Sequence, residues 1–218
     1  MSIPALTAPA PKRPRGRPRK TLDERDEGNR RLQLVKAAAR LFRRKGFDAT
    51  STRDIASAVG MHSGSPFYHF KSKGDLLYAV MEQGMQSALQ RQAAVLTPDD
   101  EAADAPADQL RRLIRSHFDT LHGPGRDFIP VMLYESRSLS PRQRNGIADL
   151  QRKYEAAWMP ALQALHKSGR LRTDARLARL LIFGALNWSV QWFDAKKSAS
   201  LDKITDAAMA LFISEDQR

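Results

Sequence analysis

Helical periodicity is the feature that most constrains the fold of this chain. From about Arg30, apolar residues recur three, four and seven positions apart and so share one face of a helix that stops at Gly46. Farther along, turn-forming breaks separate helices that we expect at about 107–122, 127–137, 141–168, 174–194 and 200–213. No β pattern of useful length and no internal repeat occurs. The sequence therefore predicts an all-α fold of about nine helices.

Residues 50–75 carry the signals of two short helices joined by a turn. The first helix has Ser51 or Thr52 as a candidate N-cap, and the second follows a further cap candidate, Ser63 or Ser65. A glycine lies in the connection, and a longer helix flanks the pair on each side. This order is that of a helix-turn-helix unit.

Positive charge is concentrated at the N-terminal end. The net charge is +12, and ten of these twelve excess charges fall within the first 78 residues. Such a distribution indicates a surface for a polyanion at one end of the molecule. The alternative is a solvated basic surface that serves solubility only.

Composition excludes several other classes of protein. The 218 residues include no cysteine, which removes disulfides and thiolate metal sites and fits a reducing cytosol. The opening MSIPALTAPA is not a secretory signal, and the longest apolar run, Leu180–Leu186, is too short to cross a bilayer. We therefore expect a cytoplasmic protein with no membrane partner.

Catalysis is not expected either. Among the five histidines, His117 and His122 form the one close pair, and a spacing of five residues puts them on different helix faces, unlike a helical zinc site. The sequence has neither a phosphate-binding glycine loop nor a nucleophilic serine elbow. The expectation is a protein without enzymatic activity, metal or cofactor.

The segment Lys12–Lys20 reads KRPRGRPRK and is the sharpest local motif. Arg15, Gly16 and Arg17 resemble the core of an AT-hook, in which the glycine lets the backbone enter a narrow minor groove while both guanidinium groups follow its negative potential. The alternative is a basic tail that attracts phosphates without specificity. Both versions predict salt-dependent affinity for DNA.

A longer set of residues at fixed spacing resembles the DNA-binding module of TetR-family regulators. The matching positions are Ala37, Ala39-Arg40-Leu41-Phe42, Lys45-Gly46-Phe47, Thr50, Thr52-Arg53-Asp54-Ile55-Ala56, Val59-Gly60, Gly64-Ser65, Phe67-Tyr68-His69-Phe70 and Lys73-Gly74-Asp75-Leu76. The resemblance implies a flexible basic arm over residues 1–29, a helix-turn-helix domain over 30–78, and a ligand-binding and dimerisation domain over 79–218.

The resemblance also implies roles for individual residues. Arg53 would reach a base edge, and Ser65, His69 and Lys73 would hold phosphates; with the arm, the expected DNA-binding set is Arg15, Gly16, Arg17, Thr52, Arg53, Ser63, Ser65, Pro66, Tyr68, His69 and Lys73. Ile55, Ala56, Val59 and Phe70 are expected in the core of the module. Three positions, Ser63, Pro66 and Phe67, depart from the family pattern, so part of the selectivity would pass to Arg53, to DNA shape and to the arm.

The C-terminal helices carry two aromatic clusters and an amide. We expect a ligand pocket lined by Phe118, Tyr134, Arg137, Tyr154, Trp158, Phe183, Asn187 and Trp188. The alternative for the aromatic residues is ordinary core packing, and a buried Asn187 could pair with protein, water or ligand. Leu133–Ser138, Tyr154, Trp158 and residues 184–188 resemble a branch of the family that responds to acyl-CoA thioesters or related lipid catabolites, with Arg137 or another nearby basic group meeting the phosphates.

Apolar stripes on the last two helices predict a homodimer. The expected interface residues are Leu177, Leu181, Leu201, Ile204, Ala208 and Leu211, with burial inside one chain as the alternative. The resemblance then implies a repressor that leaves a palindromic operator on double-stranded DNA when a small-molecule effector binds. Two other readings stay open: an architectural protein that coats A·T-rich DNA without effector control, and a ligand-binding protein whose DNA module has decayed.

Overall fold

The computed structural model describes residues 22–61, 66–96, 106–194 and 199–214. These residues form helices and connecting turns, with no strand in any of the four ranges, so the all-α expectation is confirmed. None of the described helices combines the length and apolarity that a membrane span needs. Arg15, Gly16, Arg17, Ser63 and Ser65 lie outside the described residues.

The N-terminal helices are α1 (Leu22–Lys45), α2 (Thr52–Ser57), α3 (Pro66–His69) and α4 (Lys73–Leu96). Ser51 caps α2: its hydroxyl accepts from the N–H of Asp54, whose carboxylate accepts from the N–H of Ser51 in return. The glycine that follows α1, Gly46, has a φ of 81°, a conformation that few other residues adopt. Helix α1 starts earlier than the periodicity indicated, because residues 22–29 carry no apolar stripe.

The remaining helices are α5 (Pro106–His122), α6 (Phe128–Glu135), the 3-10 turn η1 (Ser136–Ser138), α7 (Pro141–Ala156), α8 (Met159–Lys167), α9 (Ala175–Trp192) and α10 (Leu201–Phe212). The single helix expected over 141–168 is therefore wrong: it divides at Trp158 into α7 and α8. Pro160 explains the division, because proline has no N–H to continue a helix and is tolerated in a first turn.

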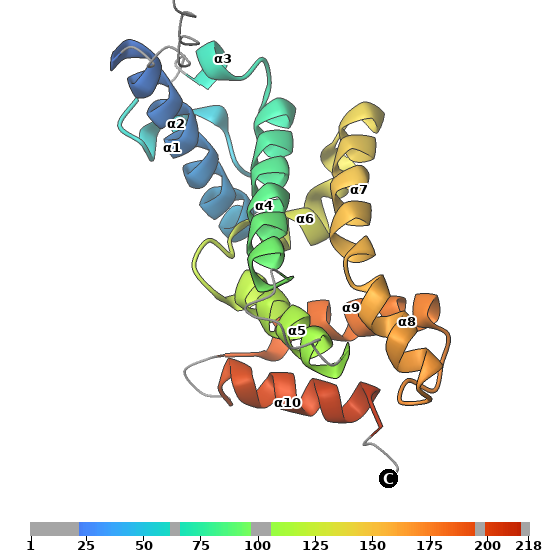
Figure 1. Ribbon diagram of the computed structural model, residues 1–218. Helices are drawn as coiled ribbons and strands as arrows, with labels where there is room; N and C mark the ends of the chain where they lie inside the picture. Colours follow the sequence, from blue (N-terminus) through green and yellow to red (C-terminus); the bar gives the residue numbers. More distant parts are fainter. Residues whose placement is uncertain (1–21, 62–65, 97–105, 195–198, 215–218) are drawn as a thin grey trace, which may run out of the picture.

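Helix α4 joins the two ends of the molecule. It packs against α1, α5, α6 and α7, and Figure 1 shows it running from the end that carries α2 and α3 towards the end where α5, α8, α9 and α10 gather. One continuous set of buried apolar side chains fills the space between these helices, and Trp158 at its centre is fully buried. The N-terminal helices α1 to α3 and the C-terminal helices thus share one core through α4.

Candidate functional site

The turn between α1 and α2 is fastened to α4 by one lysine. Lys73 Nζ donates to the carbonyl oxygens of Phe47 (2.9 Å), Asp48 (3.4 Å) and Thr50 (3.0 Å), and it lies 4.3 Å from the centre of the Phe47 ring. An ammonium group has three N–H donors, so this arrangement occupies all of them. Lys73 is expected to hold a DNA phosphate. In this arrangement it can donate to a phosphate only if one of its hydrogen bonds to these carbonyl oxygens is broken.

The accessible side chains of the module lie on α2 and α3. Arg53 is exposed in the first turn of α2, beside the partly buried Thr52. Tyr68 is 78% exposed, and its ring meets that of the partly buried His69 edge to face at 5.3 Å. Pro66 begins α3. The side chains of Arg53 and Tyr68 are therefore accessible to solvent.

The expected core of the module is confirmed. Ile55 and Ala56 are fully buried, Phe70 is buried, and Val59 is partly buried against the same core. The guanidinium of Arg31 lies over the Phe70 ring at 4.9 Å. These contacts hold α2 and α3 against α1 and so fix the directions of the exposed side chains.

Two polar contacts tie the module to α6 and the loop before it. Glu135 Oε1 accepts from the backbone N–H of Phe47 at 3.0 Å, and Arg43 pairs with Asp127 at 2.7 Å. The turn from Phe47 to Thr50 is thus bonded both to α4, through Lys73, and to α6, through Glu135. Both helices thus contact the backbone that leads into α2.

A buried polar cluster lies at the centre of the C-terminal helices. His117 Nε2 is 3.1 Å from Asn187 Oδ1 and Nδ1 is 3.0 Å from the Tyr154 hydroxyl. Because Oδ1 can only accept, Nε2 carries the hydrogen and Nδ1 accepts from Tyr154. Burial lowers the pKa of His117 to about 4 and raises the pKa of Tyr154 above its ordinary range. The imidazole is therefore neutral at physiological pH.

Aromatic rings enclose this histidine. The rings of Tyr154, Trp158 and Phe183 have centroids 5.8, 5.9 and 5.2 Å from that of His117. Within the described residues, Trp158 Nε1 is buried without a hydrogen-bond partner, which leaves one donor available to a ligand acceptor. The rings are packed together, so a ligand enters this cluster only if they separate.

Four of the residues expected in a pocket therefore meet in one place: Tyr154, Trp158, Phe183 and Asn187 surround His117. Phe118 is buried beside His122 instead. Tyr134, Arg137 and Trp188 do not join the cluster: Tyr134 is 55% exposed and bonded to Gln191, Arg137 is exposed in η1, and Trp188 is 64% exposed on α9. These three side chains lie away from the cluster, and their place in a ligand pocket stays a prediction.

His117 is the functional candidate that the sequence reasoning missed. It was considered only as a possible zinc ligand with His122. Yet Leu110, Leu113, Ile114 and Leu121 in α5 are buried, and His117 falls at the same helical spacing on that face. A histidine inside an apolar stripe was the available signal for a buried polar site.

The outer face of α9 is apolar and exposed. Leu177, Leu180, Leu181, Trp188 and Trp192 each keep at least half of their surface accessible, and a Cβ added at Gly184, on the same face, would meet no other atom within 4 Å. Such a face exposes more contiguous apolar surface than scattered single residues do. It is the strongest candidate for contact with a second copy of the chain.

Helix α10 contributes less to this face than expected. Ala208 is buried, and Leu201 and Ile204 are partly buried against the core of their own chain, because α10 packs on α5. Ala208 is therefore covered within its own chain, whereas the place of Leu201 and Ile204 in a dimer interface stays a prediction. Leu211 is 81% exposed and lines a groove of about 400 Å³ together with Leu181 of α9.

The described residues contain no group of three or more histidine, aspartate and glutamate side chains arranged to hold a metal ion. The buried His117 has hydrogen-bonding neighbours of the Tyr and Asn type rather than carboxylates or further imidazoles. This chemistry suits recognition of an organic ligand more than metal binding.

Family profiles match both halves of the chain. The profile described as "Bacterial regulatory proteins, tetR family" matches residues 34–80. The profile described as "Tetracyclin repressor-like, C-terminal domain" matches residues 103–215. Together they span the helix-turn-helix module and the C-terminal helices.

Individual proteins are also similar to this chain over most of its length. The HTH-type transcriptional repressor KstR2 of Mycolicibacterium smegmatis is 26% identical over 190 residues, covering 85% of this chain and 89% of KstR2. The crystal structure of superantigen PfiT is 36% identical, with a TM-score of 0.71, and covers 85% of this chain and 97% of PfiT. The crystal structure of AibR in complex with isovaleryl coenzyme A and operator DNA has a TM-score of 0.75 at 23% identity, covering 84% and 97%.

Proposed function

The chain belongs to the TetR family of transcriptional regulators, and on that premise we propose that it is a cytoplasmic homodimeric repressor released from a palindromic operator by a small-molecule effector. Members of this family are DNA-binding regulators and not enzymes. The observation that carries the proposal is that hydrogen bonds from two helices, α4 and α6, hold the Phe47–Thr50 turn. Because Lys73 of α4 and Glu135 of α6 both hold that turn, the orientation of α2 and α3 depends on how the C-terminal helices are packed.

Operator contact is assigned to the exposed end of the module. Arg53 reads a base edge in the major groove, and Tyr68 and His69 contact the backbone, since arginine is the side chain best suited to guanine and the other two approach from the adjoining helix. Ser63, Ser65 and the arm residues Arg15 to Arg17 complete the contact as the sequence predicts.

The effector is proposed to be an acyl-CoA thioester or a related lipid catabolite that enters the aromatic cluster around His117. The cluster combines large apolar rings with a few fixed polar groups, which is the usual chemistry of a small-molecule site. Ligand binding would separate these rings and so move α5 and α9. Coupling to DNA requires that ligand affinity differs between the two arrangements.

DNA footprinting tests the regulator directly. The repressor predicts protection of a short dyadic sequence at moderate salt, whereas an architectural protein would protect A·T-rich DNA broadly and without sequence preference. Genomic footprinting of the native chain would also identify neighbouring genes. Absence of any preference for one duplex over random competitor would contradict the proposal.

Substitution of Arg53 tests the residue that is assigned to contact a DNA base. Arg53→Ala should weaken operator binding by about 1–3 kcal/mol and relax selectivity at one base pair. Stability should be unchanged because the side chain is exposed. The matched control is Arg152→Ala on the exposed surface of α7, which should bind as the native chain does; equal affinity of all three proteins would instead favour a decayed DNA module.

A thermal-shift screen tests the effector class. Acyl-CoA thioesters of several chain lengths should raise the melting temperature, because a ligand that binds only the folded state stabilises it by mass action. His117→Phe removes the polar centre of the cluster and should abolish the shift. Failure of every thioester to stabilise the native chain would remove this class and leave the repressor assignment standing.

A further inference from the structure

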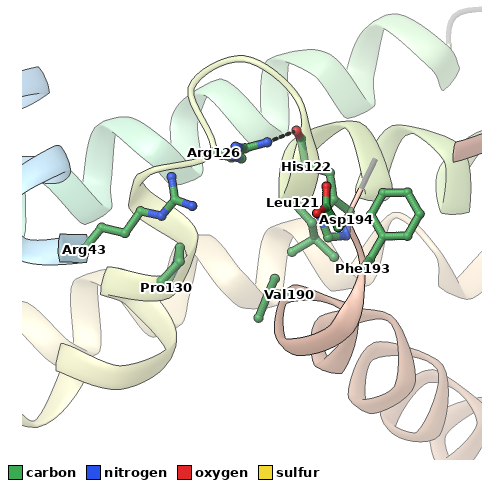
Figure 2. A pocket seen from close by; sticks show the side chains of 8 residues that line it. All are labelled: Arg43, Leu121, His122, Arg126, Pro130, Val190, Phe193 and Asp194. Carbon is green, nitrogen blue, oxygen red and sulfur yellow. Dashed lines mark hydrogen bonds between the residues drawn. The ribbon is translucent and has the colours of Figure 1, made fainter. Parts of the chain in front are cut away.

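A cavity lies outside the cluster of packed rings around His117. It encloses about 310 Å³ between the end of α1, the α5–α6 loop and the end of α9. Figure 2 shows Arg43 extending from α1 towards Arg126 of the loop, with His122 and Phe193 on the opposite side. Arg126 donates to the carbonyl oxygen of His122 at 2.9 Å.

The walls of this cavity divide into a cationic and an apolar part. Leu121, Pro130, Val190 and Phe193 supply apolar surface, while Arg43 and Arg126 supply two permanent positive charges. Two carboxylates oppose them: Asp127 pairs with Arg43 at 2.7 Å, and Asp194 borders the cavity beside Phe193. Arg126, bonded here to a backbone carbonyl, keeps further N–H donors for an anion.

His122 adds a neutral hydrogen-bonding group to the same wall. Its Nε2 is 2.8 Å from the Ser189 hydroxyl, and its ring centroid is 4.7 Å from that of Phe193. Burial and the nearby charge of Arg126 lower the pKa of His122. The imidazole therefore contributes ring surface and a hydrogen bond at neutral pH rather than a third positive charge.

We propose that this cavity binds a compact organic acid, with its oxyanion held by Arg126 and Arg43 and its apolar body against Leu121, Val190 and Phe193. Guanidinium groups match carboxylate and phosphate oxygens in geometry as well as charge. The volume lies at the small end of the roughly 300–1,000 Å³ common for ligand sites, so the cavity fits a short-chain acid and does not enclose a complete nucleotide thioester.

Binding here would act on the DNA-binding module through Arg43. That side chain belongs to the last turn of α1, three residues before Gly46, and in this structure it is paired with Asp127. An acid in the cavity competes with Asp127 for the guanidinium and so alters one of the two contacts between the module and the α6 region. That this acid acts as a second effector, besides the one assigned to the His117 cluster, rests on the function proposed above, whereas the binding itself does not.

Calorimetric titration of the full chain without DNA tests the site. The probes are hexanoate, hexyl phosphate and the neutral hexanamide. We expect one of the two anions to bind at least tenfold more tightly than hexanamide, and the better anion identifies the oxyanion. Arg126→Met should reduce that binding at least tenfold, while Arg152→Met, on the distant exposed face of α7, should leave it unchanged.

A second measurement separates ligand contact from misfolding. Bound anion should raise the pKa of His122, followed by NMR, because its negative charge offsets that of Arg126. Equal binding of hexanamide, binding of neither anion, or full binding by Arg126→Met with a native melting temperature would each overturn the proposal. Operator release by the bound acid is a separate measurement, and its failure would count against an effector role of the acid and not against the site.

Discussion

Lys73 shows how one side chain can serve the fold at a position that sequence reasoning assigns to DNA. Its ammonium joins three carbonyl oxygens of a turn whose backbone acceptors would otherwise need water. The Phe47 ring beneath it adds a cation–π contact at 4.3 Å. The residue therefore stabilises the shape of the module, and its contact with a DNA phosphate stays a prediction.

Lys73→Met should lower the free energy of unfolding by about 1–3 kcal/mol, because it removes charge-assisted hydrogen bonds while keeping most of the side-chain volume. Urea denaturation measures the change. Lys71→Met is the control, since Lys71 is exposed, and should stay within about 0.5 kcal/mol of the native chain. Native stability of Lys73→Met combined with lost DNA binding would show that the lysine contacts phosphate after all.

The buried His117 links the stability of the fold to pH. Its folded-state pKa of about 4 lies below the ordinary value of 6.5, so the unfolded chain binds more protons between these pH values. The free energy of unfolding should therefore fall as the pH drops from 6.5 towards 4. The full shift corresponds to a loss on the order of 3 kcal/mol.

His117→Gln isolates this contribution. The variant should be less stable than the native chain at pH 7, because Tyr154 and Asn187 lose their hydrogen bonds to the imidazole. Between pH 6.5 and 4.5, its free energy of unfolding should fall by less than that of the native chain. His122 also has a lowered pKa and remains in both proteins, so its effect cancels in the comparison. Parallel stability curves for the two proteins would contradict the buried, neutral imidazole.

At the scale of elements, a glycine of α4 permits the close contact between α4 and α6. Gly84 of α4 faces the ring of Phe128 in the first turn of α6, and a Cβ added there would lie 2.0 Å from Phe128 Cδ2 and 2.1 Å from Cγ. Atoms near the base of the ring cannot move aside without moving the helix. Gly84 therefore sets the distance between the helix that carries the module and the helix that carries Glu135.

Gly84→Ala should destabilise the fold by about 1–3 kcal/mol through overpacking, although alanine normally stabilises a helix interior by roughly 0.5–1 kcal/mol relative to glycine. Gly28→Ala in α1 is the matched control, since a Cβ there meets nothing within 4 Å, and it should show the ordinary gain. Chemical denaturation of both variants gives the comparison.

Adding Phe128→Leu to Gly84→Ala should recover part of the lost stability, because the smaller side chain makes room for the new methyl group. A Gly84→Ala variant as stable as Gly28→Ala would show that α4 and α6 are not in close contact. Operator affinity of the single variant reports whether the spacing of these helices also positions α2 and α3.

At the scale of the whole molecule, the exposed apolar face of α9 determines how two chains could meet. Trp188 and Leu181 lie on it, and Gly184 between them allows close approach of another backbone. Two-fold pairing, in which the same surface of each chain meets its copy, is the commonest symmetry of soluble oligomers. The distance between the helix-turn-helix modules of the two chains would follow from this contact.

Trp188→Glu should convert the dimer to a monomer, because it places a charge at the centre of an apolar contact. Sedimentation equilibrium measures the oligomeric state, and the monomer should also bind a dyadic operator much more weakly. Gln86→Glu, which makes the same change of charge at an exposed site on α4, should remain dimeric. A dimeric Trp188→Glu variant would place the interface elsewhere.

Several features of this protein follow from the sequence alone. The helical class, the burial of Ile55 and Phe70, and the presence of an N-cap at Ser51 or Thr52 are set by residues close together in the chain, and the structure selects Ser51 as the cap. Periodicity, capping and turn signals act over one or two helical turns, so they can be read without knowledge of the neighbours. The family resemblance of the module rests on the same local pattern.

Only the tertiary structure decided which face of each C-terminal helix meets which partner. Trp188 lies outward and Ile204 partly inward, and His117 joins Tyr154 and Asn187 from two other helices. Helix α9 carries apolar side chains on its buried and its exposed faces, so a stripe of Leu, Trp or Phe suits the chain's own core, a ligand or a second copy equally well. The choice among them is made by long-range packing, which contributes energy only when distant segments are already in place.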